Sequence, residues 1–348
     1  MSPEPTVSVV ICTHNGARSL PIALAAVSAQ ELRGAELELI VVDDRSTDAS
    51  ADIAARAGAR VVSTNGGGAD AGGIAAARNA GAAAASGAIV AFTDDDCEPA
   101  RTWLSELIAP FADPNVDGVA GDTVPASRES PTFRYLALRN PLAPLPAALL
   151  ESANPLFRLR RYLRDGLGPT PPLGDGSPLY SVVGANMAFR RGFLADMGGF
   201  DARIAFGGEE EDLCRRAHLR ARGARFVYAP SARVRHHYRP GLRDSLRRAR
   251  AYGQGNARQA IENAEIWPIV FPFPLLTGAA VIAAALGARR ALPAALALPL
   301  VLYPGWLTHA VRRRDAESLL FAYVQLAQEV ATMTGEVDHY LARAMAEA

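Results

Sequence analysis

Short runs of apolar, mostly β-branched residues alternate with helical patterns along the first hundred residues. The runs are VSVVIC (7–12), LELIVV (37–42), ARVVS (59–63) and AIVAFT (88–93). Between the first two, Leu20, Leu24 and Val27 recur at the spacing of one helix face. Buried strands that alternate with crossover helices predict an α/β fold with a mainly parallel sheet.

Polar residues follow each of the longer apolar runs. They are Thr13-His14-Asn15, Asp43-Asp44 and Asp94-Asp95-Asp96. In parallel sheets, ligands bind at the carboxyl ends of the strands. Three adjacent carboxylates repel one another unless a cation or hydrogen-bond donors compensate, and hard oxygen ligands suit Mg²⁺ or Mn²⁺. The acidic triplet therefore predicts a metal site, with a solvated acidic turn as the alternative.

Composition narrows the chemistry. The 348 residues carry 36 basic and 36 acidic side chains, and every basic one is arginine. A mechanism that needs a catalytic lysine is therefore excluded, and we expect no nucleic-acid partner. The three cysteines are far apart without zinc-ligand spacing, which fits a reducing compartment. No basic stretch precedes an apolar run at the N-terminus, so we expect no signal peptide and a cytoplasmic catalytic domain.

The rest of the chain divides into further zones. Residues 125–180 are rich in proline and contain RLRRYLR (158–164), which predicts an irregular insertion with a short amphipathic helix. Residues 241–266 form a basic helical connector, and residues 315–348 an amphipathic C-terminal helix. Between them, 267–314 predicts an apolar helical hairpin.

The hairpin suggests a membrane contact. Residues 269–287 carry no charge and would extend about 28 Å as a helix, close to the hydrocarbon thickness of a bilayer. A second apolar run, 291–311, follows directly. Arg289 and Arg290 at the tip oppose a true span, since a hairpin would place them outside. A shallow interfacial hairpin and two buried helices of a soluble core are the alternatives. We expect the protein at the cell membrane.

Seven motifs occur in a fixed order between about residues 7 and 240. They are VSVVICTHN, VVDDRSTD, ARNAG, FTDDDCEP, GANMAFRR, GGFD and GGEEEDLCRR. This ordered set resembles family 2 glycosyltransferases of the GT-A fold. The resemblance implies a GT-A catalytic domain over 1–240, in which 125–180 shapes the acceptor side. It also implies a nucleotide-diphosphate-sugar donor, inverting transfer, and Mg²⁺ or Mn²⁺.

The resemblance assigns roles to individual residues. It implies donor-binding roles for Thr13, His14, Asn15, Asp43, Asp44, Arg78, Asp94 and Asp95. The triplet matches the family's D-x-D motif, which implies Asp96 as a direct metal ligand and Asp94 at the ribose or the metal. His236 matches a position at which some relatives complete the metal site with a histidine.

The acids of GGEEEDLCRR match the family's G-E-D-x-D-L pattern. That match places Glu210 where the family has its general base, with Glu in place of the usual Asp. Glu209 and Asp212 are the alternatives for the base. The apolar tail favours a membrane-bound acceptor, a saccharide or a lipid-linked saccharide, as in cell-wall or extracellular polysaccharide synthesis. Two other functions compete: an inactive nucleotide-sugar-binding membrane scaffold, and a sugar-phosphate nucleotidylyltransferase.

Overall fold

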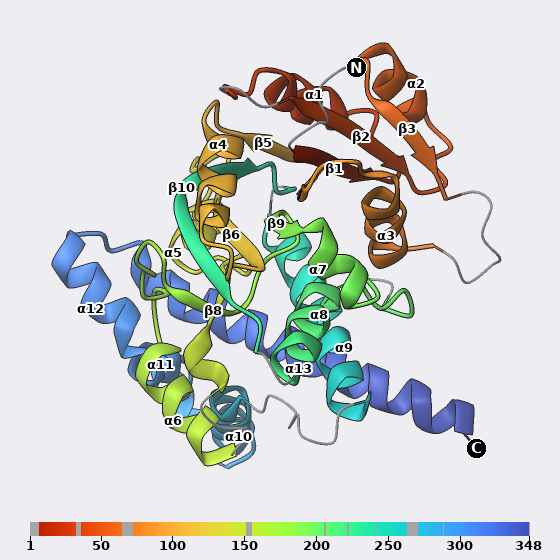
Figure 1. Ribbon diagram of the computed structural model, residues 1–348. Helices are drawn as coiled ribbons and strands as arrows, with labels where there is room; N and C mark the ends of the chain where they lie inside the picture. The colour runs from red at the N-terminus through yellow and green to blue at the C-terminus, as the bar shows by residue number, and fades with distance from the viewer. Residues whose placement is uncertain are drawn as a thin grey trace, which may run out of the picture. The chain divides into compact units, whose positions relative to one another are not determined.

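The computed structural model describes residues 7–32, 36–64, 72–150, 155–204, 207–220, 223–239, 241–262, 271–287 and 289–347. The last residues of the predicted connector (263–266), the first of the hairpin (267–270), and 151–154 of the insertion lie outside the described residues. Two compact units are present (Figure 1). Unit 1 comprises 1–126, 141–151 and 173–238, and unit 2 comprises 127–140, 152–172 and 239–348.

Unit 1 is built on one mixed sheet. Its strands are β1 (Val7–Thr13), β2 (Leu37–Asp43), β3 (Arg60–Ser63), β4 (Ile89–Asp94), β5 (Cys97–Pro99), β6 (Gly118–Pro125), β7 (Leu145–Pro146), β8 (Pro178–Ser181), β9 (Asn186–Arg190) and β10 (Phe226–His236). Among the described residues the order is β3-β2-β1-β4-β9-β6-β10-β8-β7, with β5 paired to β10. The first four strands are parallel, as predicted, whereas β9 is antiparallel to β4 and β6.

Helices cover both faces of this sheet. They are α1 (Leu20–Ser28), α2 (Ser50–Arg56), α3 (Ile74–Ala84), α4 (Trp103–Ile108), α7 (Arg191–Asp196) and α8 (Glu209–His218), with short 3-10 helices η1 (Ala109–Ala112) and η2 (Ala147–Leu150). One apolar cluster packs α1, α2 and α4 against the sheet, and a second packs α3, α7 and α8 against the other face. Because strand side chains alternate between faces, Val9 and Ile11 join the first cluster while Val10 and Cys12 join the second.

Unit 2 is helical. It contains α5 (Pro131–Leu138), α6 (Pro155–Asp165), α9 (Leu242–Glu262), α10 (Pro272–Leu286), η3 (Arg289–Ala291), α11 (Leu292–Leu302), α12 (Pro304–Arg313) and α13 (Ser318–Glu347). The predicted insertion is therefore more regular than expected, and its helices α5 and α6 cluster with the C-terminal helices. α9 and α13 approach so closely that a Cβ on Gly253 would lie 1.9 Å from the Thr332 carbonyl oxygen.

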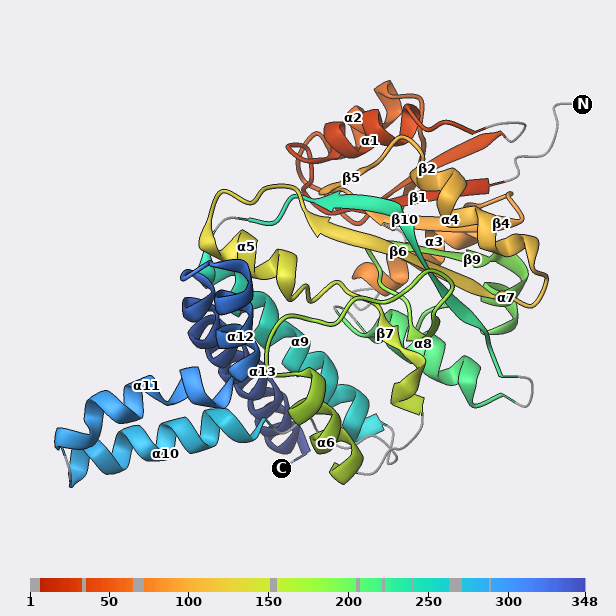
Figure 2. The same cartoon turned by 90° about the vertical axis from the view of Figure 1, so that its left-hand side faces the viewer.

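The apolar tail forms the expected hairpin of α10 and α11, which lie side by side (Figure 2). Its second run is not continuous, because the chain bends by 74° between α11 and α12, where Pro304 begins the next helix. Within the described residues, no single helix combines the length and apolar composition needed to cross a bilayer, although the bent pair α11–α12 meets both criteria when taken together.

Buried polar groups tie the helices of unit 2 together. The Glu329 carboxylate on α13 accepts hydrogen bonds from the Tyr162 hydroxyl at 2.8 Å, the Tyr303 hydroxyl at 2.7 Å, and the Gln325 amide at 2.8 Å. Only 4% of Glu329 is exposed. The Trp306 indole N–H donates to Gln325 as well. A buried carboxylate with three donors fixes the orientation of α6 relative to α13.

Candidate active site

The acidic triplet lies where β4 ends and the short strand β5 begins, beside the last strand of the unit. β4 pairs with β1 so that Asp94 lies opposite Cys12, and β5 pairs with β10 so that Cys97 lies opposite His236. These pairings bring His236 close to the triplet, although about 140 residues separate the two in the sequence. One ligand atom from each of Asp94, Asp96, Cys97 and His236 lies within 4.8 Å of the others.

The donors of this cluster suit a hard divalent cation. The His236 Nε2 atom is 3.3 Å from the Asp96 carboxylate, and the His236 ring stacks on Tyr238 at 4.1 Å. Two carboxylates and one imidazole are ligands that Mn²⁺ and Mg²⁺ sites use. Burial raises the pKa of the Cys97 thiol well above its usual value. Sequence reasoning missed Cys97; its place directly after the triplet was the available signal.

Asp95 points to a different part of the unit than its two neighbours. Its carboxylate accepts a hydrogen bond from the Thr13 hydroxyl at the end of β1. Burial, joined by the negative charges of Asp94 and Asp48, raises the pKa of Asp95 to about 6. A Cβ on Gly16 would lie 1.9 Å from the same carboxylate, so a larger residue in this turn would displace the Asp95 side chain.

The turn after β1 is held to the turn after β2. The His14 ring nitrogen Nδ1 lies 2.6 Å from the Asp44 carbonyl oxygen, and the Asn15 side chain accepts the Thr47 backbone N–H at 2.8 Å. Asn15 has a positive φ of 54°, a left-handed conformation that asparagine tolerates. Asp43 accepts the Ser46 backbone N–H at 3.3 Å. Asn15 and Asp43 therefore shape the two turns.

Asp44 is buried and strongly hydrogen-bonded. Its carboxylate accepts the Thr64 hydroxyl at 2.7 Å and the Gly73 backbone N–H at 2.9 Å. Burial opposes ionisation, but these two donors and the Arg45 guanidinium outweigh it and lower the pKa of Asp44. Asp44 is thus a fixed negative charge at the sheet edge, and Thr64 and Gly73, which sequence reasoning missed, hold it there.

Arg78 connects the acidic triplet to the second acidic cluster. It projects from α3, is 3% exposed, and contacts Glu209 and, at 3.2 Å, Asp94. Although burial disfavours its charge, these carboxylates raise the pKa of Arg78. The backbone of Gly184 passes so close that a Cβ there would lie 2.3 Å from the guanidinium. Sequence reasoning missed this glycine, although it lies within the GANMAFRR motif.

The acids at the start of α8 have distinct surroundings. Burial, then repulsion from Glu210, raises the pKa of Glu209 to about 8 against the pull of Arg78. Glu210 accepts the Gly184 backbone N–H at 3.3 Å. Asp212 is bound by Arg215 at 2.9 Å and Arg216 at 2.7 Å. Arg216 also donates to two backbone carbonyl groups, so Asp212 belongs to a fixed network.

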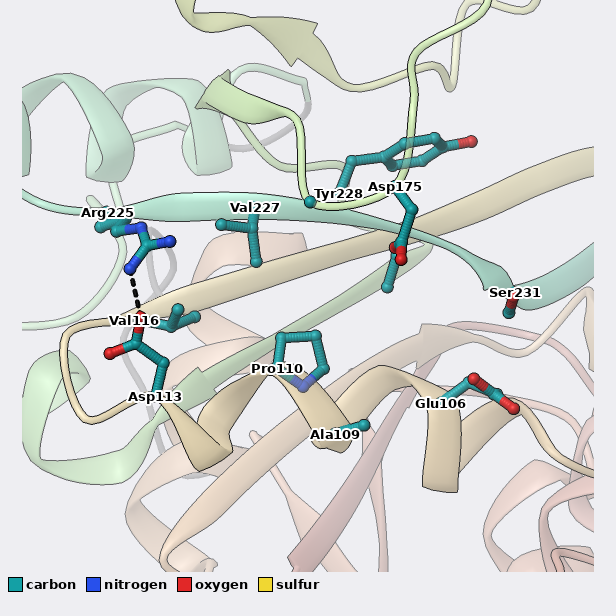
Figure 3. Close-up of a pocket in the computed structure, with 12 residues that line it drawn as sticks. Glu106, Ala109, Pro110, Asp113, Val116, Asp175, Arg225, Val227, Tyr228 and Ser231 are labelled. Carbon is teal, nitrogen blue, oxygen red and sulfur yellow. Dashed lines mark hydrogen bonds and ion pairs between the residues drawn. The ribbon is translucent and has the colours of Figure 1, made fainter.

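A pocket of about 380 Å³ lies elsewhere in unit 1, on the first half of β10 (Figure 3). Arg225 and Asp113 form an ion pair at one end, and Tyr228 and Ser231 line the other. None of the predicted site residues lines this pocket. The Tyr228 hydroxyl donates to Asp122 at 3.2 Å.

The fold and the site define a class of protein: an α/β domain with acidic side chains at the carboxyl ends of its parallel strands, joined by a histidine. A model of the family described as glycosyl transferase family 2 matches residues 8–196, more than half of the chain, and a model of glycosyl transferase family group 2 matches 173–313. The chain belongs to glycosyl transferase family 2.

Two curated relatives show sequence similarity over part of the chain. The pre-mycofactocin glycosyltransferase of Mycobacterium tuberculosis is 34% identical over 177 residues, which cover 50% of this chain and 32% of the relative. Glycosyltransferase AglE of Haloferax volcanii is 35% identical over 124 residues, which cover 34% and 39%. The chain spans about a third of the length of the curated relatives it matches.

A solved structure confirms the predicted fold. The mannosyltransferase PcManGT from Pyrobaculum calidifontis, in complex with GDP-Man and Mn²⁺, superimposes with a TM-score of 0.57. The alignment covers 97% of this chain and 88% of that protein, at 23% identity. The GT-A architecture inferred from the motifs is therefore confirmed.

Proposed function

We propose that this protein is a metal-dependent glycosyltransferase that moves a sugar from a nucleotide-diphosphate donor to an acceptor hydroxyl with inversion. The observation that carries the proposal is the convergence of Asp94, Asp96 and His236 at one end of the sheet, with Arg78 linking Asp94 to Glu209. Membership of glycosyl transferase family 2 supports it.

In the proposed reaction, Asp94, Asp96 and His236 would hold Mn²⁺ or Mg²⁺. When bound there, the ion supplies charge stabilisation for the departing nucleoside diphosphate. Thr13, His14 and Asp44 lie at the ends of β1 and β2 and bind the nucleoside. Thr64 and Gly73 fix the orientation of the Asp44 carboxylate. A hydrogen-bond acceptor that is already oriented can bind a hydroxyl or N–H group of the nucleoside without a reorganisation cost.

Glu210 acts as the general base. Arg78 contacts Glu209 and two arginines bind Asp212, so both of those carboxylates are held by cations, whereas Glu210 accepts one backbone N–H and shares a side-chain hydrogen bond with Glu209. The acceptor hydroxyl gives its proton to the Glu210 carboxylate as its oxygen forms a bond to the anomeric carbon. The bond from that carbon to the diphosphate oxygen breaks in the same step, and a single displacement inverts the configuration.

The apolar hairpin supports a site of action at the cell membrane, with the catalytic unit on the cytoplasmic side. Large side chains of α10 are exposed, among them Leu275 at 58% and Leu286 at 85%. Exposed apolar surface of this extent marks an interaction site. The acceptor we propose is a membrane-bound saccharide or lipid-linked saccharide, as in cell-wall or extracellular polysaccharide synthesis.

A panel of UDP-, GDP- and dTDP-sugars tests the proposal. Each donor is added to the full chain with Mn²⁺ or with EDTA, and thermal denaturation and donor hydrolysis are measured. We expect one donor class to raise the melting temperature and to be hydrolysed only with Mn²⁺. Asp96→Ala should abolish the Mn²⁺ response. A response to no donor, from protein shown to be folded, would instead support a catalytically inactive scaffold.

A further inference from the structure

Helix α6 presents an apolar stripe to solvent. Leu156 is 63% exposed, Leu159 38% and Leu163 44%, and their spacing of three and four residues places them on one face. Arg160 and Arg164 are exposed beside them, one turn apart. In a helix of a soluble core this stripe would be buried. Exposed leucines flanked by arginines are instead typical of helices that lie in a membrane interface.

The orientation of this stripe is fixed by Tyr162, which lies one turn from Leu159 on the adjacent side of α6. Tyr162 donates its hydroxyl to the buried Glu329, and its ring contacts Phe271 at 5.6 Å and Phe273 at 5.7 Å. The tyrosine therefore anchors α6 to both α13 and the start of α10. Rotation of the helix to bury its leucines would break the hydrogen bond to Glu329. Because Glu329 is only 4% exposed, water could not replace that bond.

The helix joined to α6 by these rings carries its own exposed apolar side chains. On α10, Leu276 is 53% and Ile282 60% exposed. α10 has 15 residues and extends about 22 Å, less than the roughly 30 Å of a bilayer's hydrocarbon core. Its length suits partial insertion from one side of the membrane. Both α6 and α10 belong to the same compact unit.

We propose that α6 is a second membrane-contacting element, which lies along an anionic bilayer surface. Its leucines enter the boundary between headgroups and acyl chains, and Arg160 and Arg164 meet the lipid phosphates. The inference rests on the membrane part of the proposed function and extends it from the hairpin to a separate segment of the chain. Charge favours lipid over a protein partner, because α6 carries four arginines and a single acidic residue, Asp165, which pairs with the exposed Arg164 at 2.8 Å.

The test measures binding of the full chain to vesicles without any sugar donor. Vesicles of phosphatidylcholine are compared with vesicles that contain about 30 mol% phosphatidylglycerol, a fraction that gives a strongly negative surface. We expect Arg160→Gln/Arg164→Gln to weaken binding to the anionic vesicles by about 30-fold and to leave binding to neutral vesicles nearly unchanged. The matched control is Arg56→Gln/Arg220→Gln, which removes two exposed arginines of unit 1 and should change binding less than twofold.

A labelled variant reports insertion directly. Cys12, Cys97 and Cys214 are all buried, so Leu163→Cys offers one accessible thiol for an environment-sensitive dye. We expect its emission to shift to the blue when anionic vesicles are added. Unchanged binding by Arg160→Gln/Arg164→Gln together with an unshifted dye would overturn the role of α6. The role of α6 would also be overturned if Arg160→Gln/Arg164→Gln changed the oligomeric state of the protein without weakening vesicle binding. The stripe would then be an interface between two copies of this chain.

The design separates this inference from the proposed function. If the α6 variants bind vesicles normally but Leu276→Gln/Ile282→Gln does not, the hairpin is the membrane contact and only the α6 inference fails. If the parent protein binds no vesicles, both membrane proposals fail. Donor hydrolysis with Mn²⁺ is measured on the same samples, so the catalytic proposal stands or falls on its own result.

Discussion

The two adjacent glutamates at the start of α8 give a sharp test of the catalytic proposal. Glu209 and Glu210 have the same side chain, yet Arg78 contacts Glu209 while Glu210 accepts one backbone N–H. We expect Glu210→Gln to lower kcat by roughly 10²–10⁴, since it removes the proton acceptor. That fall corresponds to about 3–5 kcal/mol in the barrier. Donor KM should change little, because the glutamine oxygen still accepts the Gly184 N–H.

Glu209→Gln should act on the pH profile. Glu209 holds its proton until about pH 8, because burial and then repulsion from Glu210 raise its pKa from 4.5. Ionisation of Glu209 near that pH places a second negative charge beside the proposed base, so we expect the parent rate to change as the pH passes about 8. The glutamine cannot ionise, so the rate of Glu209→Gln should show no change at that pH.

Stability gives a second readout of the same pair. A carboxyl whose pKa is higher in the folded than in the unfolded state stabilises the fold at low pH, and this contribution is lost as pH rises through the folded value. The parent should therefore lose stability between pH 4.5 and about 8, and Glu209→Gln should lose less. Donor hydrolysis and urea denaturation are measured from pH 5 to pH 9. Equal rate losses in both variants at every pH would refute the separate roles.

Three further predictions follow from single contacts. Asp212→Asn should lower the free energy of unfolding by about 1–2 kcal/mol, because two arginines bind that carboxylate, yet leave kcat within a few-fold of the parent. A fall in kcat as large as that of Glu210→Gln would make Asp212 the base. Burial raises the pKa of Glu336 on α13 to about 7 from 4.5, so the parent loses stability as the pH rises between those values. Glu336→Gln should therefore be more stable than the parent at pH 8 but not at pH 4, and equal denaturation midpoints at pH 8 would contradict this. Gly253→Ala should destabilise the α9–α13 contact by about 1–3 kcal/mol, whereas Gly192→Ala, with open space around it, should be nearly neutral by the same denaturation assay.

The parts of the fold that depend on local pattern were predictable. The apolar runs ending at Cys12, Val42 and Thr93 correspond to β1, β2 and β4, each within one residue at its carboxyl end. The direction of β9 was not predictable, because a short apolar strand has the same pattern whether it runs parallel or antiparallel. The second apolar run was expected as one segment, but Pro304 begins a new helix and the axis bends there.

The site was predictable where the motif itself carries the chemistry. The carboxylates of Asp94 and Asp96 were found from the triplet, and the structure places His236 beside them as expected. The partners of Asp44 and Arg78 could not be found, because Thr64, Gly73 and Gly184 act through a hydroxyl and backbone atoms that any sequence offers. The assignments of roles to the site residues stay predictions until variants are measured.

The position of His236 has a consequence for how the protein is made. It ends β10, the last strand in sequence, yet β10 lies within the sheet between β6 and β8 and also pairs with β5. A ribosome releases the chain from its N-terminus, so Asp94 and Asp96 are synthesised long before their histidine. β10 must then insert between strands already made, a long-range pairing of the kind that slows folding. The proposed Mn²⁺ site should therefore be completed late in synthesis, only once residues up to about 238 have left the ribosomal tunnel.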